Sequence, residues 1–233
     1  MYNLVTRYDK TKVNVYMNKK EGKALAALAV ERLKHIYPDA ECALHWGGGA
    51  ENAWKLLVMG RLSAQCTDKR VNIVCETLFE RFPTARELGD GDIAEIEEIV
   101  KPCGLYRMKA SDIKNACKML CDEYDGIIPD DMDELLKFPG VGRKIANLLL
   151  GDLYKKPAIV ADTHCIRICG RLGFYPEEQK DPVKTEKIMR ELVEPAEQSD
   201  FCHRIVWFGR ETCTARSPKC EECPLADICK GRK

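Results

Sequence analysis

The stretch with the clearest chemical potential is a glycine-rich turn that places a lysine at the start of a helix. Residues 139–144 read PGVGRK, and the apolar run after Lys144 has the i, i+3, i+4 spacing of a helix. Gly140 and Gly142 can both adopt φ > 0 and let a ligand approach the backbone. Free N–H groups at a helix N-terminus favour an anion such as phosphate. The turn therefore predicts a phosphate site, with a plain turn between two helices as the alternative.

Lys144 occupies a position that is unfavourable for a cation. The helix dipole opposes protonation of an amine in the first turn, and we expect this amine to be buried, which also favours its neutral form. A neutral amine is a nucleophile. Asp162 follows 18 positions after Lys144, in an Asp-Thr-His start to another apolar run. A solvated lysine and a simple helix N-cap at Asp162 are the alternative interpretations.

Four cysteines near the C-terminus form a second constellation. Cys213, Cys220, Cys223 and Cys229 have the spacing C-x6-C-x2-C-x5-C, in a tail with too few apolar residues to bury four unligated thiols. Four thiolates suit either zinc or an iron–sulfur cluster. Zinc ribbons more often use two C-x2-C pairs, and only one is present here. The spacing therefore favours an iron–sulfur cluster without excluding zinc.

The charge distribution bears on the partner. The formal net charge of zero argues mildly against nucleic acid, but residues 203–233 carry seven Lys/Arg against four Asp/Glu. Local fields, rather than the total charge, steer a polyanion. Arg216 and Lys219 lie in the loop between the first two clustered cysteines, where they could contact phosphates or simply be solvated.

Composition places the chain among ordinary globular proteins. Its 233 residues are 32% charged and 45% hydrophobic, which suits one or two domains. No apolar run reaches the length of a membrane span and no N-terminal signal pattern is visible, so we expect a cytoplasmic protein with reduced thiols and no membrane partner. The other nine cysteines are scattered, and we interpret them as core residues.

Nearly every periodic segment has helical spacing, which predicts an all-α fold. The first helix is expected to bury a face made of Leu25, Leu28, Leu33, Ile36 and Tyr37. Thr67 or Asp68 is expected to cap one later helix, and Ser111 or Asp112 another. Residues 12–16 (KVNVY) are the one candidate strand.

Together these motifs resemble the helix-hairpin-helix DNA glycosylases, most closely the endonuclease III family. The resemblance covers roughly residues 23–230. It rests on LSAQCTD (62–68), GLY (104–106), PGVGRK (139–144), VADTHCIRICGR (160–171) and the four-cysteine spacing, in that order along the chain. The first 20 residues have no counterpart in the family, and we treat them as an N-terminal extension of unknown structure.

The resemblance implies a fold, a cofactor and a partner. It implies two all-α domains: a six-helix domain at 46–157, whose helix-hairpin-helix spans about 131–150, and a domain at 21–45 and 158–233 that holds a [4Fe-4S] cluster on the four cysteines. It further implies a monomer that binds double-stranded DNA with a damaged base or an abasic site in the cleft between the domains. The expected substrates are oxidised pyrimidines. The expected location is cytoplasmic, on the nucleoid if the source is bacterial.

The resemblance also implies residue roles. Lys144 would attack the sugar C1′, displace the base and form a Schiff base, after which β-elimination cuts the strand. Asp162 would assist the attack, and Gly140 and Gly142 would hold a phosphate beside the lesion. The other implied DNA contacts are Gln65 and Leu105, which would enter the duplex, and Arg143, His164, Arg216 and Lys219.

Two departures from the family pattern concern the substrate. Arg61 stands where endonuclease III usually has an apolar residue, and the adenine mismatch glycosylases have a catalytic glutamate there, so we expect Arg61 near the base pocket. Leu136 replaces a family glutamate near the hairpin. Two alternatives remain open: a monofunctional glycosylase, which would lack the hairpin lysine, and a non-catalytic iron–sulfur DNA-binding module, which would need neither Lys144 nor Asp162.

Overall fold

The protein is built from helices and loops. A computed structural model describes residues 18–231; no strand occurs in that range, which confirms the all-α class, and the candidate strand at 12–16 lies outside it. None of the described helices is both long and apolar enough to cross a membrane. The helices are α1 (Lys19–Ile36), α2 (Ala53–Leu62), α3 (Asp68–Arg81), α4 (Ala85–Asp90), α5 (Ile93–Val100), α6 (Tyr106–Glu123), α7 (Met132–Leu135), α8 (Arg143–Tyr154), α9 (Thr163–Leu172), α10 (Pro182–Leu192) and α11 (Gln198–Glu211), with short 3₁₀ helices η1 (Ala50–Asn52), η2 (Lys101–Cys103) and η3 (Pro195–Glu197).

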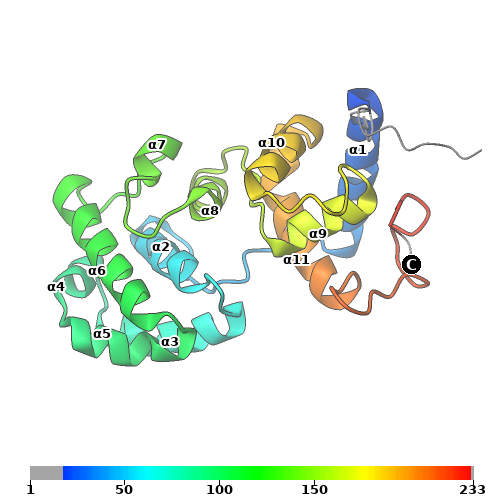
Figure 1. Ribbon diagram of the computed structural model, residues 1–233. Helices are drawn as coiled ribbons and strands as arrows, with labels where there is room; N and C mark the ends of the chain where they lie inside the picture. The colour runs from blue at the N-terminus through cyan, green and yellow to red at the C-terminus, as the bar shows by residue number, and fades with distance from the viewer. Residues whose placement is uncertain (1–17, 232–233) are drawn as a thin grey trace, which may run out of the picture.

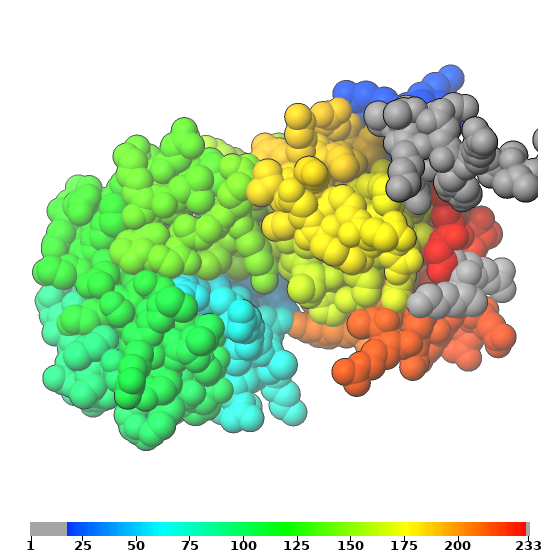
Figure 2. All heavy atoms as spheres, in the orientation of Figure 1, coloured from blue at the N-terminus to red at the C-terminus, as the bar shows by residue number. Residues whose placement is uncertain are grey.

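The helices form two groups (Figure 1), and each group surrounds its own hydrophobic core. The first core lies among α2 to α8 and contains fully buried leucines such as Leu56 and Leu78. The second lies among α1, α9, α10 and α11 and includes Phe201 and Phe208. The two lobes stand side by side in Figure 2, with a notch between them along one edge. We propose that the two cores correspond to the two domains expected from the sequence.

The buried face of α1 differs from the expected one. Leu28 and Ile36 are exposed, at 42% and 39% of their surface, whereas Ala26, Ala29 and Leu33 are fully buried. Small side chains let α1 lie close to α10 and α11, and the larger apolar residues are left on the outer side. The expectation based on large apolar residues was therefore wrong for Leu28 and Ile36.

Helix caps explain where several helices begin. Thr67 caps α3, as expected, by accepting a hydrogen bond from the backbone N–H of Arg70 at 3.3 Å. The expected cap at Ser111 or Asp112 is wrong, because α6 begins earlier, at Tyr106, and both residues lie inside it. The residue before α6 is Leu105, which has the left-handed conformation and provides no side-chain cap.

Candidate active site

The hairpin between α7 and α8 carries the glycine-rich turn. Gly140 has φ +74°, a left-handed conformation that favours glycine. Gly142 has φ −106° and ψ 177°, so the expectation of a positive φ is wrong at this position. Gly142 is the N-cap of α8 and supplies no side-chain cap, and a Cβ built there would meet nothing within 4 Å. The first N–H groups of α8 are therefore open to an external anion.

A buried ion pair lies directly beneath this turn. The Arg61 Nε donates to Asp112 Oδ2 at 2.7 Å, and only 8% of Arg61 is exposed. A Cβ at Gly140 would lie 2.5 Å from Arg61 Nε and 2.8 Å from Asp112 Oδ2. The pair thus joins α2 and α6 under the hairpin. The expectation that Arg61 lies near the base pocket stays a prediction.

Lys144 and Asp162 line the same solvent-open cavity, which has a volume of about 70 Å³. Gly60 of α2, Ser63 at the end of α2 and His203 of α11 also line it. Arg61 is not among its lining residues. Lys144 is exposed, so the expectation that its amine is buried is wrong for the DNA-free protein.

Asp162 is held by the start of α9. Its Oδ1 accepts a hydrogen bond from the backbone N–H of Cys165 at 2.7 Å, which makes it the N-cap of that helix. The sequence anticipated both a cap and an assisting carboxylate, and the cap is confirmed. An aspartate that caps a helix has a fixed orientation, so the Asp162 carboxylate has a defined position in the wall of the cavity.

Two exposed residues, Gln65 and Leu105, have strained backbones. Gln65 has φ +54° and Leu105 has φ +49°, in the left-handed region that non-glycine residues seldom adopt. Leu105 exposes 52% of its surface. Such conformations cost about 1–2 kcal/mol each and persist where the surroundings enforce them, often at ligand sites. They occur at the two residues expected to enter a DNA duplex.

The predicted contacts at Arg143 and His164 have partners within the protein. Arg143 makes a two-pronged ion pair with Glu186, from Nε at 2.9 Å and from Nη2 at 2.6 Å. Arg167 Nη2 lies 3.2 Å from His164 Nδ1, and because arginine can only donate, that nitrogen accepts. Burial, together with nearby cations including Arg167, lowers the pKa of His164 below its ordinary value of 6.5. His164 is therefore mainly neutral near pH 7.

All four clustered cysteines line one cavity, together with apolar side chains of α9 and α11. Four thiols around one cavity with an apolar wall fit a [4Fe-4S] cluster.

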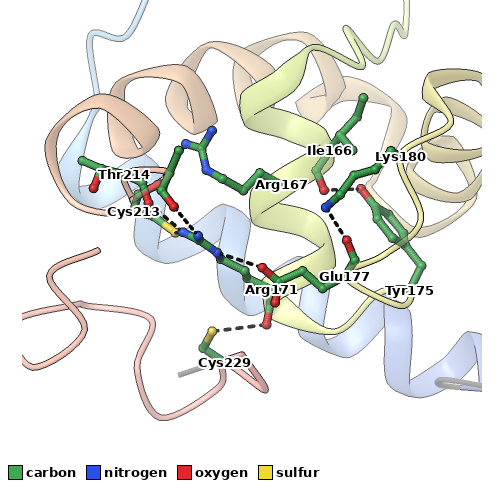
Figure 3. A network of polar contacts seen from close by, with 10 residues as sticks. Ile166, Arg167, Arg171, Tyr175, Glu177, Lys180, Cys213, Thr214 and Cys229 are labelled. Carbon is green, nitrogen blue, oxygen red and sulfur yellow. Dashed lines mark hydrogen bonds and ion pairs between the residues drawn. The ribbon is translucent and has the colours of Figure 1, made fainter. Parts of the chain in front are cut away.

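Arg171, at the end of α9, organises the loop that carries the first of these cysteines (Figure 3). Its Nη1 lies 3.4 Å from Cys213 Sγ and donates to the Thr214 carbonyl at 2.8 Å, while its own carbonyl accepts from Cys229 Sγ at 3.3 Å. The guanidinium thus holds the Cys213 sulfur and the neighbouring carbonyl in place. Arg171 was not singled out from the sequence, although it lies in the quoted 160–171 motif. Arg216 and Lys219 are exposed on the same loop.

Two segments of the chain match known protein families. Residues 58–195 match the HhH-GPD superfamily of base excision DNA repair proteins, and residues 213–229 match the iron–sulfur binding domain of endonuclease III. Endonuclease III of Synechocystis is 40% identical over 91% of this chain and 94% of its own length. The enzyme of Bacillus subtilis is also 40% identical, over 88% of this chain and 91% of its own.

A solved structure extends the likeness to the fold. A trapped covalent intermediate between endonuclease III and DNA is 39% identical in sequence, with a TM-score of 0.82. The match covers 90% of this chain and 96% of the other.

Proposed function

The chain belongs to the endonuclease III family of the HhH-GPD base excision DNA repair proteins, and from this we propose how its residues act. As a DNA glycosylase with lyase activity, it removes an oxidised pyrimidine from duplex DNA and then cuts the strand. The observation that carries the assignment of residues is the shared cavity of Lys144 and Asp162. We also propose that the protein acts as a monomer on the DNA of the nucleoid.

DNA recognition begins with the backbone. The unpaired N–H groups at the start of α8 hold a phosphate of the damaged strand, where Gly142 leaves room for close approach. A base inside a duplex is out of reach, so the nucleotide must turn out of the stack. Leu105 and Gln65 enter the duplex and fill the vacated space. Arg216 and Lys219 contact phosphates from the cluster loop.

The reaction proceeds at the sugar. The Lys144 amine, in its unprotonated form, bonds to C1′ as the C1′–N bond to the base breaks, and the base departs with a proton. Asp162 stabilises the positive charge that develops on the sugar ring. The adduct opens to a Schiff base, and loss of a C2′ proton expels the 3′ phosphate, which breaks the strand by β-elimination.

The iron–sulfur domain supports this chemistry structurally. Cys213, Cys220, Cys223 and Cys229 would hold a [4Fe-4S] cluster as four thiolates. Because such a cluster binds the folded tail and not the unfolded one, its binding energy stabilises the loop that carries Arg216 and Lys219.

Separate assays of base release and strand cutting test the proposal. The wild-type protein should release the base from a thymine-glycol duplex and leave a β-elimination product. Base release without strand cutting would favour a monofunctional glycosylase. Binding without either reaction would favour a non-catalytic module.

A further inference from the structure

Arg143, the residue next to Lys144, forms a two-pronged ion pair with Glu186 that links the two cores, and we call this pair the fork. Arg143 is the first residue of α8, and its guanidinium meets both carboxylate oxygens of Glu186 on α10, at 2.9 and 2.6 Å. The Glu186 side chain is only 5% exposed and that of Arg143 is 43% exposed, so the carboxylate is buried while the guanidinium is partly open to water. Two parallel bonds to one carboxylate fix orientation as well as distance.

The fork matters because Lys144 and Asp162 sit on opposite sides of the core boundary. Helix α8 packs into the first core, whereas Asp162 caps α9 in the second. Their separation therefore depends on how the two cores are aligned. The other end of α8 is tied in the same way, because His203 Nε2 on α11 lies 2.7 Å from Asp152 Oδ1, with both side chains about nine-tenths buried.

From this arrangement we infer that Arg143 and Glu186 are a positioning pair, which aligns Lys144 with Asp162 across the boundary between the cores. The inference rests on the proposed function of those two residues. An error of about 1 Å in the placement of reacting groups can cost about 100-fold in rate. Loss of the fork should therefore slow the chemical step more than it weakens DNA binding.

A role in positioning differs from the DNA contact expected for Arg143. The guanidinium edge that could grip a phosphate with two bonds, Nε and Nη2, is already occupied by Glu186. If Arg143 served the DNA, removing the Glu186 charge would free the cation and tighten binding. If Arg143 serves alignment, removing that charge would loosen α8 and slow the reaction.

The test compares three variants in single-turnover cleavage of an abasic duplex, with the dissociation constant measured alongside. Glu186→Gln and Arg143→Lys should each lower the single-turnover rate by about 10-fold or more, with the dissociation constant within about 2-fold of wild type. Arg190→Gln is the matched control, because Arg190 also lies 3.6 Å from Glu186 but on the same helix. It should stay within about 2-fold of wild type in both measurements.

Other outcomes overturn the inference. Tighter DNA binding by Glu186→Gln would make Arg143 a phosphate contact. A near-wild-type single-turnover rate in Arg143→Lys would show that the pair does not align Lys144 with Asp162. Circular dichroism and cluster absorbance check that each variant folds. If Glu186→Gln does not fold, the partly exposed Arg143→Lys still decides. A wild-type protein that fails to cut the abasic duplex would refute the proposed function itself.

Discussion

Lys144 and Asp162 line one cavity although the helices that carry them belong to different hydrophobic cores. Neither lobe alone contains both groups. The site is therefore completed by the packing of α8 against α11, so contacts between the lobes control the geometry of the proposed catalytic pair.

The two hairpin glycines should respond differently to alanine. Gly140→Ala forces a left-handed alanine and a Cβ against Arg61, so the free energy of unfolding should fall by about 2 kcal/mol or more. Gly142→Ala has an allowed φ and open space, so its stability should change by less than about 0.5 kcal/mol. Its DNA affinity should nevertheless fall, because the methyl group occupies the path of the phosphate. Urea unfolding and fluorescence anisotropy measure the two effects.

Equal DNA affinity in Gly142→Ala and wild type would contradict a phosphate site at the start of α8. Equal destabilisation of both alanine variants would show that Gly142 has a structural role instead.

The pair of Arg61 and Asp112 should govern stability and leave lesion choice alone. Asp112→Ala strands a buried guanidinium, which should cost about 3 kcal/mol of unfolding free energy. Arg61→Leu should cost less, because the Asp112 side chain is 22% exposed and can be hydrated. Relative excision rates on a panel of lesion duplexes should be unchanged in Arg61→Leu, since Arg61 does not line the cavity. A reordered panel would place Arg61 in base recognition after all.

The sequence predicted those features of the site that depend on neighbouring residues. The PGVGRK turn, the cap at Asp162 and the cysteine spacing are each encoded within a few positions, so local geometry was enough. The partner of Arg61 lies 51 positions away and the partner of Arg143 lies 43 positions away. Which carboxylate each arginine meets depends on how the helices pack into the cores, and the spacing of residues along the chain does not specify that packing. The left-handed backbones at Gln65 and Leu105 are likewise imposed by their surroundings, against local preference.

The fork of Arg143 and Glu186 should give a characteristic pH dependence. Burial raises the pKa of Glu186, but hydrogen bonds from Arg143 and Asn147 lower it by more, so the net pKa lies below the ordinary 4.5. A carboxylate with a lowered pKa stabilises the fold above pH 4.5, and this stabilisation is lost as the pH falls through its folded-state pKa. The difference in unfolding free energy between wild type and Glu186→Gln should therefore be largest near pH 7 and shrink below pH 4.5.

Urea unfolding at a series of pH values, with cluster absorbance recorded in parallel, measures this difference. A difference that stays constant from pH 7 down to pH 3 would show that the Glu186 charge does not contribute to folding.

Arg171 should control retention of the cluster. Arg171→Met removes the donors to the Thr214 and Ala215 carbonyls and to Cys213 Sγ, so the loop should loosen and the cluster should be lost faster to a chelator. Arg216→Gln is the control, because Arg216 is exposed on the same loop. Visible absorbance and the ratio of iron to protein follow the loss. Equal loss in both variants would contradict the role of Arg171. A colourless wild type containing stoichiometric zinc would contradict the iron–sulfur cluster.

Sodium borohydride trapping tests the role of Lys144 most directly, because the reagent reduces a Schiff base to a stable bond between protein and DNA. The wild-type protein on an abasic duplex should give a covalent adduct whose modified peptide contains Lys144. Asp162→Asn should fold, since asparagine also caps a helix, but should give the adduct more slowly. Lys144→Ala should give none while still binding the duplex. Absence of an adduct from the wild type, or a full yield from Lys144→Ala, would contradict the mechanism.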